Sequence, residues 1–185
     1  IAVKKPVFPF NKFPKQNIFL SPEMKSTGEV IGLDKHLGGA YAKAELGAGQ
    51  SLPKNGTIFI SINNSDKISA IPIARDFIEL GFSIIATKGT AKLLIENGIF
   101  VSQIYKVGEG RPNVVDAIKN QEIQLVINTP LGAQSRFDEY KIGQSSIKYK
   151  IPVITTISGA QAAVRGIRNI KSNSIQYQSL QEIFA

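Results

Sequence analysis

The sequence contains no cysteine, and this absence excludes several kinds of chemistry. Without thiols the chain can form no disulfide, no thiolate metal site and no cysteine nucleophile. Its single histidine, His36, leaves no set of histidines for a zinc site, so we expect no metal centre. No segment approaches the roughly 18 consecutive apolar residues of a membrane span, so we expect a soluble protein without a membrane partner.

Length and composition favour one ordinary domain with a smaller attached segment. Of the 185 residues, 43% are hydrophobic and 19% are charged, which is enough to bury a core. The chain begins with IAVKKPVFPF, which is neither an initiator methionine nor a signal peptide, so we expect a fragment of a longer protein. The lack of cysteine fits a reducing compartment.

The net charge of +8, from 22 basic and 14 acidic residues, raises the question of nucleic-acid binding. The lysines and arginines are scattered, without a basic run or the aromatic-interleaved motif of RNA-binding domains. A solvated, lysine-rich surface is the simpler interpretation. A nucleic-acid-binding module stays an alternative, but we expect no nucleic-acid partner, and a small anionic ligand remains open.

From residue 57 onward, short apolar runs alternate with helical patterns. We expect strands at 57–62, 82–87, 101–107, 124–129 and 152–157. We expect helices at 68–81, at 90–97 before a Gly98 cap, from Pro112, at 138–149 and from Gly159. Five β-rich runs separated by helices predict an α/β fold with a doubly wound, mostly parallel, five-stranded Rossmann-like sheet.

The first 50 residues have a different pattern. FPFNKFP (8–14) is expected to be extended, PEMKSTGEVIG (22–32) to be a glycine-containing loop, and 41–46 to be helical. GAGQSLPKNG (47–56) has the composition of a linker. We therefore predict two parts, residues 1–50 and residues 51–185.

Polar residues follow three consecutive strands of the predicted sheet. Thr87, Gly89 and Thr90 stand where the second strand turns into a helix, Lys67 stands at the helix start after the first strand, and Lys106 ends the third. Amide groups at a helix start, with hydroxyls and a glycine, suit a phosphate. The threonines could instead be simple helix caps, and Lys67 could be merely solvated. Their convergence at one sheet edge favours an anion site.

The fourth and fifth strands end in weaker candidates. Asn128 could hydrogen-bond a ribose or a base edge, or could satisfy turn backbone. Thr155 and Thr156 are candidates by position alone, because threonine is also a common strand residue.

Several motifs, in their order and spacing, closely resemble the end of the large subunit of carbamoyl-phosphate synthetase. They are PFNKFP, PEMKSTGEVIG, AYAKAELGAG, ATKGTA, VGEGRP and INTPLG. The resemblance covers essentially the whole chain. It implies that residues from about 57 form a methylglyoxal-synthase-like allosteric domain, and that residues before 50 are the tail of the second ATP-grasp unit, which makes carbamoyl phosphate from carbamate.

The resemblance also implies the parent's activity. The family makes carbamoyl phosphate from glutamine-derived ammonia, bicarbonate and two ATP, for pyrimidine and arginine synthesis, in the cytoplasm or in plastids. The parent would use ATP with Mg or Mn and K, its own ATP-grasp units and a glutaminase small subunit, with possible oligomerisation. The fragment itself is expected to be non-catalytic and without cofactor, because the family's ATP loop and metal-binding glutamates lie upstream. Glu23 and Glu29 are then expected to shape a loop between domains.

In many bacterial members of the family, UMP inhibits and IMP can activate at this domain. The family's phosphate contacts fall on Lys67, Thr87, Thr90 and Lys106. Its sugar or base contacts fall on Ser61, Asn128 and Asp138. These positions include all the strand-end candidates of the first three strands, so we predict a site for a UMP- or IMP-type nucleotide.

Some positions depart from the family's pattern. The two residues that contact ornithine in its best-known bacterial members, a glutamate and a tyrosine, are Lys5 and Val153 here, so we do not expect ornithine regulation. A nucleotide-site threonine is replaced by Pro130, and an arginine pair by Ala133-Gln134, which leaves the base preference open. A docking or oligomerisation domain that has lost its ligand is therefore an alternative.

Methylglyoxal-synthase-type lyase activity is the least favoured alternative. The related synthases need an aspartate base in a GGDQQ-like loop and an early histidine. Here Arg111-Pro112 stand near the aspartate's place, Asp116 lies further along, and 63–66 occupy the histidine region.

Overall fold

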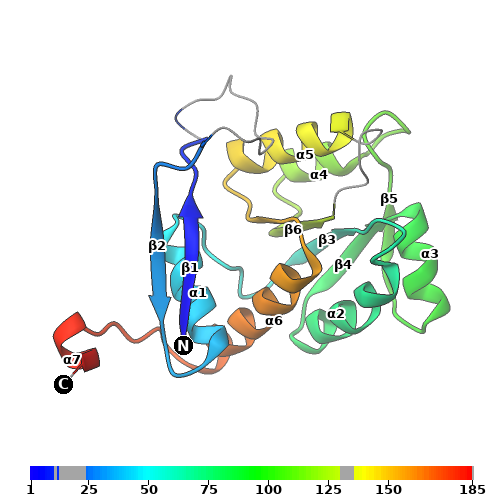
Figure 1. Ribbon diagram of the computed structural model, residues 1–185. Helices are drawn as coiled ribbons and strands as arrows, with labels where there is room; N and C mark the ends of the chain where they lie inside the picture. The colour runs from blue at the N-terminus through cyan, green and yellow to red at the C-terminus, as the bar shows by residue number, and fades with distance from the viewer. Residues whose placement is uncertain (11, 13–23, 130–135, 185) are drawn as a thin grey trace.

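The structure confirms an α/β fold with a parallel five-stranded sheet (Figure 1). It is a computed structural model that describes residues 1–184 except 11, 13–23 and 130–135. The strands of this sheet are β3 (Thr57–Ser61), β4 (Ser83–Thr87), β5 (Ser102–Ile104), β6 (Leu125–Asn128) and β7 (Val153–Ile154). Their order is β5-β4-β3-β6-β7, so the chain winds outward from β3 in one direction and then continues from β6 in the other.

Helices cover both faces of the sheet, as a doubly wound fold requires. One face carries α2 (Lys67–Glu79), α3 (Lys88–Glu96) and α6 (Ile157–Ser172). The opposite face carries α4 (Val114–Lys119) and α5 (Arg136–Lys148) (Figure 1). Among the described residues, no helix is long and apolar enough to cross a membrane.

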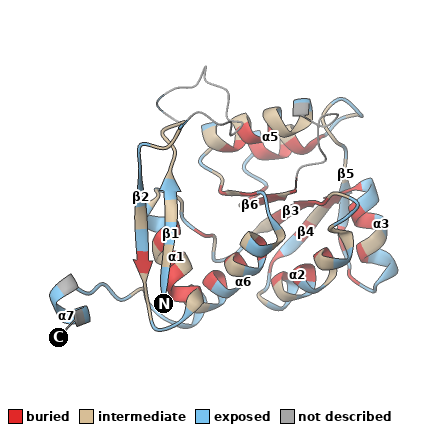
Figure 2. Ribbon diagram, in the orientation of Figure 1, coloured by how far each residue is buried: buried red, intermediate tan, exposed pale blue. Residues whose placement is uncertain are grey.

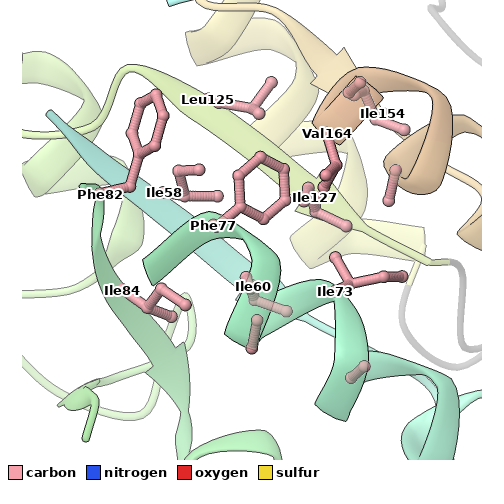
Figure 3. Close-up of a cluster of buried hydrophobic side chains, with 14 of the residues drawn as sticks. Ile58, Ile60, Ile73, Phe77, Phe82, Ile84, Leu125, Ile127, Ile154 and Val164 are labelled. Atoms are coloured by element: carbon pink, nitrogen blue, oxygen red, sulfur yellow. The ribbon is translucent and has the colours of Figure 1, made fainter. Parts of the chain in front are cut away.

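Successive side chains of the central strands point to opposite faces of the sheet, and this divides the core into two clusters. Ile58 and Ile60 of β3 pack with Phe77 of α2 and Val164 of α6 on one face (Figure 3). Phe59, between them, packs with α4 and α5 on the other face. All three β3 residues are fully buried, and buried residues also line the inner sides of the helices (Figure 2). Each such side chain contributes about 1.5–3 kcal/mol by leaving water, so β3 is the anchor of both layers.

Residues before the sheet form a separate antiparallel pair and a helix. The elements are β1 (Ala2–Val7), β2 (Gly28–Leu33) and α1 (Leu37–Gly47). Helix α1 packs on α6 through small residues: a Cβ placed on Gly38 would lie 2.3 Å from the Arg165 carbonyl oxygen. Ala42 of α1 belongs to the same core cluster as the α2 side of the sheet. The boundary near residue 50 stays a prediction.

The expectation of a loop over residues 22–32 is wrong for its second half, because residues from Gly28 belong to β2. Its glycine is a packing residue: a Cβ on Gly32 would lie 2.0 Å from the Ala40 carbonyl oxygen, so only glycine lets β2 lie on the backbone of α1. Strand β1 was not expected either, because its lysines hide the alternation of Val3 and Val7. Half of the PFNKFP motif lies outside the described residues. In the other half the expectation of an extended segment is wrong, because Lys12 N–H donates to the Pro9 carbonyl oxygen at 2.9 Å and the chain turns there.

Several predicted boundaries also shift. Helix α4 begins after Asn113, which caps it, so Pro112 is not in its first turn. Helix α6 begins at Ile157 rather than Gly159, and α3 begins at Lys88 rather than Thr90. The edge strands β5 and β7 are shorter than the apolar runs because each pairs with one neighbour only; past β5, the Tyr105 carbonyl accepts from Val114 N–H at 3.2 Å instead of continuing beside β4. A short C-terminal helix, α7 (Leu180–Phe184), was not expected.

A buried ion pair joins the antiparallel pair to α1. The Lys5 ammonium contacts the carboxylate of Glu45, a side chain only 3% exposed, and also donates to Gln50 Oε1 at 3.3 Å. Burial, together with the charge of Glu45 and a hydrogen bond to it, raises the pKa of Tyr41, which keeps the phenol protonated. The neighbouring Lys4 points to the other face of β1 and pairs with Glu29 in solvent.

Replacing Lys5 by methionine should lower the free energy of unfolding by about 2 kcal/mol, because Glu45 is left buried without its cation. The loss is smaller than for a fully enclosed pair because the Lys5 side chain is 24% exposed. The control is Lys4→Met, whose ion pair is exposed on both sides and whose loss should cost less than about 0.5 kcal/mol. Urea unfolding of both variants measures the difference in the free energy of unfolding. Equal losses would contradict the conclusion that the Lys5–Glu45 pair is the more stabilising of the two.

Candidate functional site

A pocket lies beyond the carboxyl ends of the central strands, beside the point where the strand order reverses. Its internal volume is small, about 20 Å³, and it opens to solvent. Its lining residues are Ser61, Thr87, Lys106, Val114, Asn128, Asp138, Glu139 and Ile142. Five of the seven predicted nucleotide-site residues are among them, and the other two, Lys67 and Thr90, lie outside the lining. Such a reversal is where ligands bind in open α/β sheets.

The register of the sheet explains why the polar strand ends meet. Ser61 stands directly beside Asn128 in the β3–β6 pair. In the β3–β4 pair Ile60 stands beside Ala86, which brings the next residues, Ser61 and Thr87, together. The Thr87 hydroxyl lies 3.3 Å from the Ser61 hydroxyl, and both side chains are buried. A row of polar groups therefore crosses the ends of three neighbouring strands.

Helix α3 starts at this row without a side-chain cap. Thr87 is its N-cap residue, but its side chain makes no capping hydrogen bond, and no acidic residue stands in the first turn. By contrast, Thr156 at the start of α6 accepts from Gly159 N–H at 3.0 Å, and Asn113 caps α4. The amide groups at the start of α3 thus carry partial positive charge with no side-chain acceptor among the described residues.

Lys67, the first residue of α2, approaches the same helix start. Its Nζ lies 3.5 Å from the position that a Cβ on Gly89 would occupy, so the ammonium stands over the first turn of α3. A cation near a helix N-terminus is unfavourable unless an anion lies between them. The arrangement therefore suits a bound anion, although Lys67 is not part of the pocket lining.

Thr90 has a bond that the sequence did not indicate. Its hydroxyl oxygen accepts from the Ile62 backbone N–H at 3.2 Å, and the side chain is 1% exposed. It therefore ties the end of β3 to α3. The hydroxyl proton of Thr90 is not used by this bond and can still be donated.

The pocket lining carries charges of both signs. Burial raises the pKa of Asp138; Lys106 opposes this shift, whereas Glu109 and Glu139 add to it. The Lys106 backbone N–H also lies 3.4 Å from a Glu109 carboxylate oxygen. Lys106, Asp138 and Glu139 therefore lie together in the pocket lining, with half-buried Asn128.

Sequence reasoning missed part of the lining. Glu139 and Ile142 lie on α5 with Asp138, and the four-residue spacing from Asp138 to Ile142 places both on one helix face, which could have indicated the second. Val114 is the first residue of α4. Its role follows only from the packing of α4 against the sheet, which no local pattern shows.

The residues weighed for other roles have other partners. The Asp116 carboxylate accepts from Asn113 N–H at 3.1 Å and completes the capping box of α4, and Arg111 is 82% exposed. Val153 lies in β7. Among the described residues, no group of three or more histidine, cysteine, aspartate or glutamate side chains could hold a metal ion. The remaining departures lie outside the described residues: Glu23, Pro130, Ala133 and Gln134.

Comparison with known proteins finds one family model and many close relatives. Residues 69–155 match the MGS-like domain. The carbamoyl phosphate synthase large chain of Nostoc sp. is 52% identical over 98% of this chain and 16% of its own length. The carbamoyl phosphate synthase large chain, C-terminal section, of Aquifex aeolicus is 46% identical over 99% of this chain and 35% of its own. The arginine-specific large chain of rice, a chloroplastic protein, is 46% identical over 100% of this chain and 16% of its own.

The pKa of Asp138 gives the site a testable dependence on pH. A carboxyl group whose pKa is raised by folding contributes stability that is complete below its ordinary value of 3.8 and is lost as the pH rises through the folded-state pKa. Asp138→Asn removes this charge. The variant should therefore unfold at a higher temperature than the unchanged chain near neutral pH, and the difference should vanish below about pH 3.5. Thermal unfolding across this range measures it, and a variant that is less stable near neutral pH would contradict the direction.

Proposed function

Because this chain carries an MGS-like domain and is a homologue of the C-terminal section of carbamoyl phosphate synthase large chains, we propose that its pocket binds a nucleotide effector of the UMP or IMP type. The observation that carries the proposal is the meeting of Ser61, Thr87, Lys106, Asn128 and Asp138 in one pocket. These residues come from four strand ends and one helix. The family resemblance had implied that each of them contacts the same bound nucleotide.

The phosphate lies at the start of α3 in this proposal. The uncapped amide groups of the first turn and the Thr87 and Thr90 hydroxyls donate to it, and the ammonium groups of Lys67, from the start of α2, and Lys106, from the loop after β5, pair with it. A phosphate there removes the unfavourable approach of the Lys67 ammonium to a helix N-terminus. Ser61, Asn128 and Asp138 face the sugar or base, with hydroxyl, amide and carboxylate groups that can pair with ribose hydroxyls and a base edge.

The chain spans 16% to 35% of the length of the relatives described above, so the activity of a whole synthase is also a proposal. The parent is a glutamine-hydrolysing ligase that makes carbamoyl phosphate for pyrimidine and arginine synthesis. It uses ATP with Mg or Mn and K, and it works with its own ATP-grasp units and a glutaminase small subunit, in the cytoplasm or in a plastid. Residues 1–50 are the tail of the second ATP-grasp unit.

Regulation then requires that the effector bind two packing arrangements unequally. Helix α6 starts at the pocket edge of the sheet and packs on α1, which contacts the antiparallel pair β1 and β2. A bound nucleotide biases how the domain packs on the ATP-grasp unit, and a coupling of about 1–3 kcal/mol changes affinity there by about 5- to 150-fold. Asp116 completes the capping box of α4 and does not line the pocket, which disfavours the lyase alternative.

Calorimetric titration of UMP and of IMP into the full 185-residue chain tests the binding step. One nucleotide should bind at one site per chain. Lys106→Met and Lys67→Met should each weaken the affinity by about ten-fold or more, because each removes a charge-assisted contact to the phosphate. The matched control is Lys92→Met on α3, whose side chain is 76% exposed and pairs with Glu96, and which should bind as the unchanged chain does.

Absence of heat with both nucleotides in a folded sample would overturn the proposal and favour a docking domain without ligand. Affinity for long single-stranded nucleic acid that falls steeply with salt, without saturation by a mononucleotide, would favour the nucleic-acid alternative instead.

A further inference from the structure

The start of the loop between β3 and α2, residues 62–66, is held by two buried threonine hydroxyls, one from helix α3 and one from the residue after β6. Ile62 N–H donates to the Thr90 hydroxyl oxygen at 3.2 Å, and Asn63 N–H donates to the Thr129 hydroxyl oxygen at 2.9 Å. Thr129 is 2% exposed and follows Asn128 directly at the end of β6. Its own N–H donates to the Ser61 carbonyl oxygen at 3.0 Å, so the backbone there is fixed as well.

Within the loop, Asn63 organises the residues that lead to Lys67. The Asn63 side-chain oxygen accepts from Asp66 N–H at 2.9 Å and from the Ser65 hydroxyl at 2.6 Å. Its amide nitrogen donates to the Asp66 carboxylate at 2.8 Å. Asp66 is the N-cap residue of α2, and Lys67 is the first residue of that helix. The position of Asn63 therefore sets where α2 begins and from where the Lys67 side chain extends.

The start of α2 determines where the Lys67 ammonium lies. Its ammonium stands over Gly89, at the uncapped start of α3, only while α2 starts where it does. The bond from Thr129 to Asn63 joins residues 66 positions apart and connects the end of β6 to this lysine. Residues 128 and 129 thus have two roles. Asn128 lines the pocket, and the Thr129 hydroxyl holds the loop that precedes Lys67.

We propose that Thr129 is a positioning residue for the anion site: its hydroxyl holds Asn63, and through the loop it places the Lys67 ammonium over the start of α3. This inference rests on the proposed nucleotide binding. Thr129 is not among the described residues that line the pocket. It acts on binding only through Lys67, which distinguishes it from a residue that merely stabilises the fold.

Calorimetry on the full chain tests this, with UMP as the probe, or IMP if only IMP binds. Thr129→Val keeps the shape of the side chain and removes the acceptor, and it should weaken binding by about five- to ten-fold, the effect of one hydrogen bond. Thr129→Ser keeps the hydroxyl and should bind within about two-fold of the unchanged chain. In a Lys67→Met background, Thr129→Val should add less than about two-fold, because the two changes act on one contact.

An unchanged affinity for Thr129→Val, or an undiminished effect of it in the Lys67→Met background, would overturn the inference while leaving the proposed function intact. Failure of the unchanged chain to bind either nucleotide would remove the proposed function and this inference with it.

A measurement without a variant covers the case in which Thr129→Val does not fold. Since coupling between two events is reciprocal, nucleotide binding should strengthen the bond to Thr129. The Asn63 amide proton of the unchanged chain should exchange with solvent several-fold more slowly when UMP is bound, as observed by NMR. An exchange rate that does not change at saturating nucleotide would contradict the proposal.

Discussion

The parallel pairing of β3 with β4 on one side and β6 on the other is the constraint from which the rest of the domain follows. It leaves Ile58, Phe59 and Ile60 fully buried, so both faces of the sheet must be covered and the intervening chain must form helices on each. The same pairing aligns Ser61, Asn128 and Thr87 at one edge. The apolar core and the polar site are thus consequences of one register.

The polar edge is available to a ligand because its groups are only partly used within the protein. Thr87 turns its hydroxyl toward Ser61 instead of capping α3, which leaves the helix start open. The hydroxyl oxygens of Thr90 and Thr129 accept backbone amides of the adjacent loop. Two threonines hold the scaffold, one faces the pocket, and the difference between them arises from position rather than residue type. This division explains why four polar strand ends produce a pocket and not a closed hydrogen-bond network.

The sequence predicted the elements that depend on local periodicity, and it missed those that depend on distant partners. Apolar runs located all five strands of the sheet, because buried parallel strands are continuous in hydrophobicity. Strand β2 was missed because Gly32 is read as loop-forming until α1 is known to lie against it. The candidate site residues were predicted from the order of strand ends and from family resemblance, and five of the seven line one pocket. By contrast, the Thr129–Asn63 bond spans 66 residues, and no local pattern contains it.

The N-terminal part owes its place to close helix packing rather than to its own core. A two-stranded antiparallel pair is marginal by itself, and β1 and β2 are exposed or half-buried along most of their length. Helix α1 holds them in place. It contacts β1 through the Lys5–Glu45 ion pair, and it packs closely on β2 at Gly32 and on α6 at Gly38. At Gly38 and Gly32 the backbones are too close for any side chain, so α1 cannot shift without disturbing both neighbours. Since α6 starts at the carboxyl edge of the sheet, the contact between α1 and α6 links β1 and β2 to the layer that ends at the candidate site.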